Sequence, residues 1–356
     1  MKVRQPIEML EDQLLVTHLA GSKAYGTNLP TSDTDIRGIF VADELYHRSP
    51  WYTVNEIEIP EDEDTKYYEL SKFLKLLVDQ NPNIVESLWV DEDDILTSSP
   101  GYELLRANRE QLLSSKVAFT FSGYAVSQLK RIKGHNKWIN NPQPEERPKQ
   151  YEFMSLIQSL TEDKELKYTT EDIVRDQKTY SLLHYGNDVF GMYLRPSPGS
   201  PWVFDDSGAL VTNTPREQVS GQPVRIIKFN RDEYKLAKEK HKQYWDWKTN
   251  RNESRSELEE KFGYDTKHAM HLVRLLRMAE EVLSEGIVRV KRPDAQELLS
   301  IRDGAWTYEE LVSYAEEVDN RIRNELYKST KLRKTVDVKF ASKLLMEVQE
   351  LAWGKQ

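Results

Sequence analysis

The sequence predicts an α+β fold in which short strands dominate the first third of the chain and helices dominate the rest. Three observations support this prediction. Before residue 70, short apolar runs with β-branched residues alternate with turn-forming residues, which is typical of strands. Apolar residues recur at helical spacing from Leu70. The same spacing returns through most of the chain after Ser114.

Four short segments are predicted to be strands. Residues 14–20 (LLVTHLA) and 36–42 (IRGIFVA) are apolar runs followed by turn-forming residues, as expected for buried strands. Residues 52–59 alternate in polarity, and residues 65–68 are a fourth candidate. A helix is predicted next, and its apolar face consists of Leu70, Phe73, Leu74, Leu77 and Val78.

The rest of the chain is expected to form a helical domain with one interruption. Residues 187–230 are rich in Gly, Pro, Ser and Asp between short apolar pieces, which indicates a β-containing insertion or a long loop. Residues 266–285 are the clearest helix, because their apolar residues form one stripe. We therefore expect a core domain at residues 1–112 and a helical domain at residues 113–356.

The composition excludes several classes of protein. The 356 residues carry a net charge of −9, with 38% hydrophobic and 31% charged residues, as in an ordinary globular chain. No apolar run approaches the roughly 18 residues of a membrane span, and the first residues lack the apolar segment of a signal peptide. The sequence has no cysteine, which excludes disulfides, thiolate metal ligands and cysteine nucleophiles. We expect a cytoplasmic protein without a membrane partner.

The segment from His18 to Val41 (HLAGSKAYGTNLPTSDTDIRGIFV) carries the strongest chemical signal. Residues i and i+2 of a strand project from the same face, so Asp33 and Asp35 are expected to converge where the second strand begins. Two close carboxylates repel each other unless a cation lies between them, and Mg²⁺ prefers oxygen ligands. Gly21 allows close approach of the backbone to a phosphate, and the Ser22 hydroxyl can donate to it. This combination suits metal-assisted phosphoryl or nucleotidyl transfer.

Two other kinds of site have a similar spacing and are rejected. The carboxylates superficially fit an EF-hand calcium loop, but Arg37 would occupy a ligand position and the flanking segments are predicted strands. The glycines have the spacing of a P-loop, but Thr27 stands where the lysine is required. An isolated Asp-x-Asp is most often a solvated turn, so the assignment depends on the surrounding motifs.

The pair Gly21-Ser22 followed by Asp33-x-Asp35 resembles the signature of the DNA polymerase β-like nucleotidyltransferase superfamily. Longer phrases resemble one branch, the RlaP-like nucleotidyltransferases associated with RNA repair. They lie between residues 18 and 306 and are, in order, GSKAYGTNLPTSDTDIRGIFV, YYELSKFLKLLVDQNPNIVESLW, QLKRIKGHNKW, YWDWKTNRNESR, YDTKHAMHLVRLLRMAEEVLSEG and RPDAQELLSIRDGAW. The resemblance implies a small mixed sheet with helices on one face, followed by a mostly helical domain.

The resemblance also implies a third catalytic carboxylate on a neighbouring strand. Within EDEDTKYYEL, we prefer Asp64, which stands at the head of the predicted strand 65–68. Glu69, at the start of the next helix, is the rival, and Asp62 fits an acidic loop equally well. Asp33, Asp35 and the third carboxylate would hold two Mg²⁺ ions, with Mn²⁺ as an alternative. One ion would activate the acceptor hydroxyl, and the other would neutralise the departing pyrophosphate.

A nucleoside triphosphate also needs cationic partners, and two clusters are candidates. The first lies in the phrase QLKRIKGHNKW and consists of Lys130, Lys133 and His135, although such clusters are often solvated. The second lies at positions i, i+4 and i+7 of the predicted helix 266–285 and consists of Lys267, His271 and Arg274. We expect both clusters to contact phosphate or nucleic acid.

The resemblance and the carboxylates together predict an Mg²⁺-dependent nucleotidyltransferase that transfers a nucleoside monophosphate from a nucleoside triphosphate to a hydroxyl. The expected acceptor is an RNA end, such as that of a tRNA-like molecule. Two alternatives stay open: transfer of AMP to a protein side chain, and binding of nucleotide or RNA without catalysis. The intact Gly21, Ser22, Asp33 and Asp35 count against the second alternative.

Overall fold

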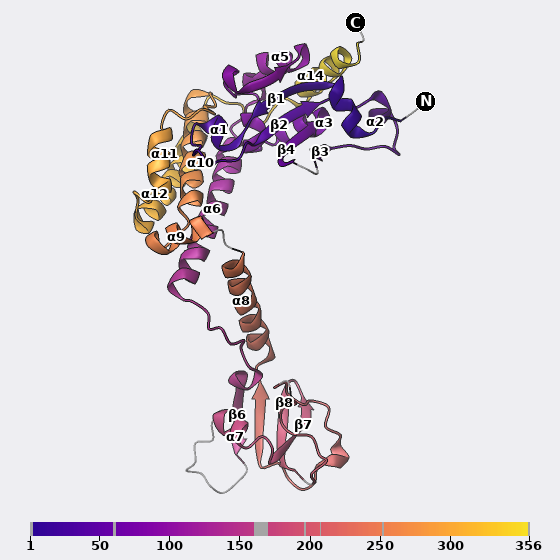
Figure 1. Cartoon of the computed structure of the whole chain (residues 1–356), viewed down its shortest axis with the longest axis vertical. Coiled ribbons are helices and arrows are strands. Elements are labelled where there is room, and N and C mark those ends of the chain that lie inside the picture. The colour runs from indigo at the N-terminus through magenta and orange to yellow at the C-terminus, as the bar shows by residue number, and fades with distance from the viewer. Residues whose placement is uncertain are drawn as a thin grey trace. The chain divides into compact units, whose positions relative to one another are not determined.

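The computed structural model describes residues 3–59, 62–159, 170–195, 197–206, 208–250 and 253–354. The chain divides into two compact units, and Figure 1 labels many of their elements. The first unit combines Met1–Ile139 with Glu253–Gln356, and the second is Asn140–Asn252. The boundary expected at residue 112 lies inside the first unit. The division into a catalytic core at residues 1–112 and a helical domain at residues 113–356 stays a prediction.

A five-stranded mixed sheet lies in the first unit. Its strands are β1 (Leu14–Leu19), β2 (Ile36–Phe40), β3 (Glu56–Ile59), β4 (Asp62–Glu69) and β5 (Ile95–Ser98). The spatial order is β3-β4-β2-β1-β5, in which β2 and β4 are parallel and the other neighbours antiparallel. Strands β1 to β4 confirm the four predicted strands. Strand β5 was not predicted, since three of its four residues are exposed and give no apolar pattern.

The rest of the first unit is mostly helical. The α-helices are α1 (Gly21–Tyr25), α2 (Glu44–Arg48), α3 (Leu70–Val78), α4 (Pro82–Glu86), α5 (Pro100–Ala107), α6 (Val117–Asn140), α9 (Glu253–Phe262), α10 (Thr266–Glu285), α11 (Ala295–Arg302), α12 (Tyr308–Arg321), α13 (Tyr327–Ser329) and α14 (Val338–Ala352). Short 3₁₀ segments are η1 (Pro6–Glu11), η2 (Glu92–Asp94) and η3 (Arg109–Leu112), and η6 (Ile322–Leu326) is a π-helix. Helix α3 contacts β2 and β4, α5 contacts β1, and α14 packs on α3 and α5.

Helix α10 has more buried residues than any other described helix of the first unit, and it has the bounds predicted from the sequence. It begins after Asp265, whose side chain accepts a hydrogen bond from the His268 N–H, and ends at Gly286, which has a φ of +74°. Twelve of its residues are buried, from Thr266 to Leu283. Its side chains belong to the same hydrophobic cluster as those of β1 and α3, so α10 and the sheet share one core.

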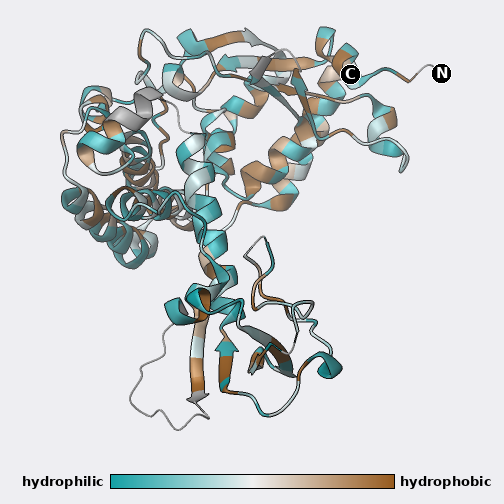
Figure 2. Cartoon of the chain, turned by 60° about the horizontal axis from the view of Figure 1, so that its bottom comes forward, coloured by the Kyte–Doolittle hydropathy of each residue, from teal (hydrophilic) through white to brown (hydrophobic). Residues whose placement is uncertain are grey.

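The second unit contains its own sheet and core. The strands are β6 (Met154–Ser159), β7 (Tyr180–Gly186), β8 (Val189–Leu194) and β9 (Arg225–Phe229), in the antiparallel order β6-β9-β8-β7. The accompanying helices are α7 (Thr170–Arg175), α8 (Arg231–Thr249), η4 (Gln150–Phe153) and η5 (Arg216–Gln218). Figure 2 shows hydrophobic residues along these strands, where Leu182, Phe190 and Ile227 are fully buried. The insertion predicted at residues 187–230 is therefore part of a larger sheet.

The fold class predicted from the sequence is confirmed in outline. A five-stranded mixed sheet forms from the N-terminal region, and a mostly helical part with a second small sheet follows. Within the part of the chain that the structure describes, no helix has both the length and the apolar character required to cross a membrane.

Candidate active site

Gly21 brings the start of α1 against the Asp35 carboxylate. Strand β1 ends at Leu19, and the Ala20 N–H donates to the Asp35 carbonyl at 2.9 Å, which joins β1 to the entrance of β2. Gly21 then turns the chain with a φ of +57°. A Cβ at this position would lie 2.0 Å from the Asp35 Oδ2 atom. Only glycine therefore fits both the backbone conformation and the space that the carboxylate occupies.

Three carboxylates gather at this end of β2 and β4. Parallel pairing sets Ile36 opposite Thr65, so Asp35 and Asp64 stand side by side one residue earlier. Asp33 is exposed, whereas Asp35 is half-buried. Burial raises the pKa of Asp35, and the negative charges of Asp33 and Asp64 raise it further. The sequence-predicted carboxylates Asp33, Asp35 and Asp64 are thus brought together, while the side chain of Asp62 lies outside the described residues.

Two cations adjoin these carboxylates. Arg37 Nη2 lies 4.0 Å from Asp35 Oδ1, and its Nη1 donates to the Asp64 carbonyl at 2.9 Å. Lys267, at the start of α10, and Arg37 both counteract the rise in the pKa of Asp35. Lys267 was predicted from its place on the helix. Arg37 was considered only as an obstacle to calcium binding, although its i+2 spacing from Asp35 on a strand could have identified it.

Glu69, the rival for the third carboxylate, lies at the other end of β4. It pairs in register with Phe40, five residues beyond Asp64, which is about 16 Å along a strand. Its Oε2 accepts hydrogen bonds from the backbone N–H groups of Ser71 and Lys72. Its Oε1 lies 3.4 Å from His47 Nε2. Glu69 is 3% exposed and caps α3.

Of the other cations predicted on α10, His271 lies among positive charges. Burial lowers the pKa of its half-buried ring to about 3, and the nearby charges of Arg274, Lys267, His268 and Arg302 add to this effect. His271 is therefore a neutral ring beside Lys267 at physiological pH. Such a ring can donate or accept one hydrogen bond but supplies no charge.

Arg274, the third predicted α10 cation, belongs to a buried network. Its Nη1 donates to Glu86 Oε1 at 2.7 Å, and its guanidinium lies 3.8 Å from the centre of the Tyr25 ring. The Tyr25 hydroxyl donates to the other oxygen of Glu86 at 2.6 Å. Arg274 is 5% exposed. Its contacts therefore join α10 to α1 and α4 inside the first unit.

The cations predicted on α6 have different surroundings. Lys130 is exposed, and Lys133 pairs with Glu316 of α12 at 3.1 Å. His135 faces two carboxylates, those of Glu259 and Asp265. A phosphate beside His135 would meet this negative charge, so we do not include His135 in the proposed nucleotide site.

One comparison with known proteins gave a match. Residues 4–154 match the model of a family described as the RNA repair pathway DNA polymerase beta family (RlaP). The matched segment contains β1, β2 and β4, and therefore all three carboxylates, whereas α10 lies outside it. No curated protein and no solved structure matched the chain.

Proposed function

We propose that this chain transfers a nucleoside monophosphate from a nucleoside triphosphate to a hydroxyl of RNA. Its residues 4–154 match the model of the RNA repair pathway DNA polymerase beta family. The family indicates a nucleotidyltransferase. The RNA acceptor is suggested by the family's place in RNA repair. The observation that carries the proposal is the meeting of Asp33, Asp35 and Asp64 beside Gly21.

The three carboxylates fit divalent metal ions. Asp33 and Asp64 both raise the pKa of Asp35, so the group concentrates negative charge that a cation would offset. Carboxylate oxygens are also the ligands that Mg²⁺ and Mn²⁺ prefer. We assign the metal-binding role to Asp33, Asp35 and Asp64. Bound ions would lower the pKa of the acceptor hydroxyl and neutralise charge on the leaving pyrophosphate.

In the proposed reaction, the acceptor hydroxyl oxygen forms a bond to the α-phosphorus of the triphosphate. The bond from that phosphorus to the bridging oxygen of the β-phosphate breaks, and pyrophosphate leaves with the bonding electrons. The hydroxyl proton passes to the Asp64 carboxylate. Gly21 leaves room for the Asp35 carboxylate beside the backbone, and Ser22 and Lys267 bind the oxygens of the triphosphate. Positioning and charge stabilisation provide most of the rate enhancement in such reactions.

The role of Lys267 follows from its neighbours. It lies close enough to Asp35 and His271 to change the pKa of both. A cation next to the carboxylates can bind a phosphate oxygen that is not coordinated by metal. His271 stays neutral beside it and can supply one hydrogen bond to the same group.

A transfer assay tests the proposal. The protein is incubated with each α-labelled nucleoside triphosphate, Mg²⁺ and total cellular RNA. The Asp33→Ala/Asp35→Ala double variant should transfer no label. Asp91 and Asp93 form another exposed Asp-x-Asp pair in the same unit, so Asp91→Ala/Asp93→Ala is the matched control and should keep full activity. Label on RNA with the intact protein supports the proposal.

Other outcomes would identify the alternatives. Label on a protein band and none on RNA would replace the acceptor by a protein side chain. Nucleotide binding without any transfer would favour a non-catalytic binding protein. Transfer that persists in the Asp33→Ala/Asp35→Ala variant would contradict the assignment of the site itself.

A further inference from the structure

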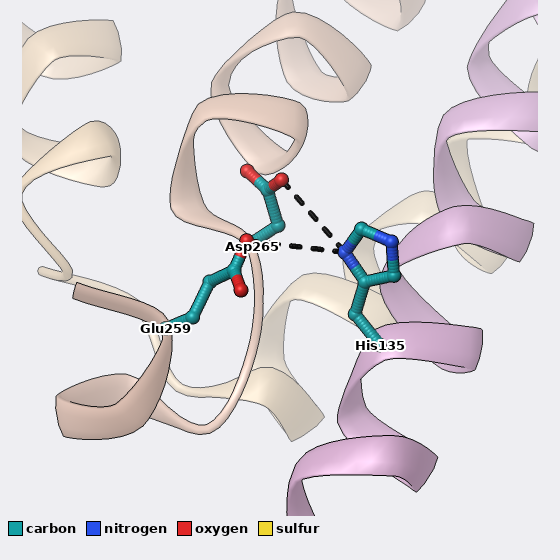
Figure 3. Close-up of side chains that lie close together, drawn as sticks. All are labelled: His135, Glu259 and Asp265. Atoms are coloured by element: carbon teal, nitrogen blue, oxygen red, sulfur yellow. Dashed lines mark ion pairs between the residues drawn. The ribbon is translucent and has the colours of Figure 1, made fainter. Parts of the chain in front are cut away.

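A second cluster of metal-ligating side chains lies in the first unit, built from α6, α9 and the residue that caps α10. Figure 3 shows the His135 ring of α6 pointing toward the carboxylates of Glu259 and Asp265. His135 Nδ1 lies 3.9 Å from Glu259 Oε1 and 3.8 Å from Asp265 Oδ2. One potential ligand atom from each residue lies within 4.8 Å of the others.

The burial of the two carboxylates favours a cation at this position. The side chains of Glu259 and Asp265 are 2% and 0% exposed, and that of His135 is 19% exposed. Two carboxylates that are close together and removed from water are costly unless positive charge compensates them. His135 and His268 already lie within ion-pair distance of these carboxylates, and a divalent ion would be bonded to both carboxylates directly.

The distances suit ligands of one ion. Zinc binds histidine nitrogen and carboxylate oxygen at about 2.0–2.2 Å, so two of its ligand atoms lie no more than about 4.4 Å apart. The distances of 3.8 and 3.9 Å from His135 Nδ1 fall within this limit and exceed a hydrogen-bond length. All three ligand atoms lie within 4.8 Å of one another, so a bound ion would require the cluster to contract.

Neighbouring groups already hold the ligands in place. The His268 N–H donates to Asp265 Oδ1 at 2.9 Å, and the His268 ring Nδ1 lies 2.5 Å from Asp265 Oδ2. Asn136, next to His135, donates from Nδ2 to the Gly263 carbonyl at 2.9 Å, which joins α6 to the turn between α9 and α10. Hydrogen bonds to ligating carboxylates and to the backbone beside them are typical of metal sites in proteins.

We propose that His135, Glu259 and Asp265 bind one divalent transition-metal ion of the Zn²⁺ or Mn²⁺ type, at a site separate from Asp33, Asp35 and Asp64. One imidazole with two carboxylates favours such ions over Mg²⁺ and Ca²⁺, which prefer oxygen ligands alone. The ion fixes the turn between α9 and α10 to α6. The ion would also help to position Lys267, which follows this turn at the start of α10; this role alone depends on the proposed function.

Metal binding is measured on full-length protein without a histidine tag, in the Asp33→Ala/Asp35→Ala background that removes the first site. Zn²⁺ or Mn²⁺ is titrated in competition with a chromogenic chelator, with Mg²⁺ and Ca²⁺ as comparisons. We expect one equivalent of Zn²⁺ or Mn²⁺ per chain to bind. Absence of that equivalent, or equal affinity for Mg²⁺, would overturn the proposal whatever the transfer assay shows.

Two variants locate the ion. Glu259→Gln keeps the shape of the side chain and should remove the bound equivalent, and so should His135→Gln if Glu259→Gln does not fold. Glu260→Gln changes the next, exposed residue of α9 and should leave binding unchanged. Binding that survives both Glu259→Gln and His135→Gln would place the ion elsewhere and refute the assignment.

Thermal unfolding gives a second readout that needs no competing chelator. Zn²⁺ should raise the melting temperature of the intact protein, and Glu259→Gln should abolish that rise. Without metal, the melting temperature of Glu259→Gln reports the structural role of Glu259 alone, because its carboxylate also pairs with His135. A lower metal-free melting temperature together with no zinc effect in the intact protein would identify a purely structural cluster and overturn the proposal.

Discussion

At the scale of single residues, Gly21 determines whether the Asp35 carboxylate can occupy its place. Gly21→Ala would put a Cβ 2.0 Å from Asp35 Oδ2 in a left-handed backbone conformation, with a φ of +57°. Gly26→Ala is the matched control, because Gly26 has a φ of +70° but its Cβ would meet nothing closer than 3.9 Å. Both variants strain the backbone by about 1–2 kcal/mol, and only the first displaces the carboxylate.

We therefore expect Gly21→Ala to lower the transfer rate by about 100-fold or more, the usual effect of misplacing a reacting group by an ångström. Gly26→Ala should stay within a few-fold of the intact protein in the same assay. Similar rates in the two variants would show that the contact between Gly21 and Asp35 has no part in the reaction.

Asp64 and Glu69 have different surroundings, so replacing Asp64 should affect the transfer rate and replacing Glu69 should affect stability. Asp64→Ala should reduce transfer by about 100-fold or more with little change in melting temperature. Glu69→Ala removes the cap of α3 and should lower the free energy of unfolding by about 0.5–2 kcal/mol. At temperatures where the variant is still folded, its transfer rate should equal that of the intact protein. Denaturant unfolding and the transfer assay together check this pair. The reverse pattern would make Glu69 the third carboxylate.

At the scale of elements, α10 carries cations with different surroundings. Arg274 is paired with Glu86 in the core, and loss of one member of a buried ion pair costs about 3–5 kcal/mol. Arg274→Met should therefore lower stability by this amount. Lys267→Met should instead raise the KM for the nucleoside triphosphate by about 10-fold, as expected for loss of one charged hydrogen bond, at unchanged melting temperature. A rise in KM in Arg274→Met and none in Lys267→Met would contradict the assignment of a structural role to Arg274 and a binding role to Lys267.

The position of His271 on α10 makes stability depend on pH. Its pKa is about 3 in the folded protein and 6.5 ordinarily, because burial and the charges of Arg274, Lys267, His268 and Arg302 oppose protonation. Between these values the unfolded chain binds a proton that the folded protein does not, so stability falls as the pH falls below 6.5.

His271→Gln should remove this contribution, which amounts to at most about 1.4 kcal/mol per pH unit for one proton. Urea unfolding of the intact protein and of the variant at pH 7 and pH 5 measures it. An unchanged loss of stability between these two pH values in His271→Gln would show that the ring is protonated in the folded protein.

At the scale of the whole molecule, helices and strands with a local sequence pattern could be predicted from the sequence. Contacts between residues far apart in the chain could not. Helix α10 was predicted with its bounds from its apolar stripe, and the Asp265 cap and Gly286 at its two ends are local features as well. The second sheet was predicted only in part. Strand β6 pairs with β9, whose register sets Met154 opposite Phe229, and no local signal reveals such a partner.

The candidate site shows the same limit. The convergence of Asp33 and Asp35 was predicted from strand periodicity, although both residues precede β2. The place of Asp64 came from resemblance to the family. The burial of Arg274 could not be predicted, because its partner Glu86 is 188 residues away in the sequence. Helical spacing predicted Arg274 on the same flank as Lys267. The structure shows that Arg274 is buried and paired with Glu86, whereas Lys267 lies near Asp35.

The most direct test of the central claim measures the pyrophosphate released for each nucleotide joined to RNA. The intact protein with Mg²⁺ should release one pyrophosphate per labelled nucleotide incorporated, and Asp35→Asn should lose both products together. Asp35→Asn keeps the size of the side chain, so a loss reports on charge at the three carboxylates. Turnover retained by Asp35→Asn would contradict the assignment of Asp33, Asp35 and Asp64 as the catalytic site.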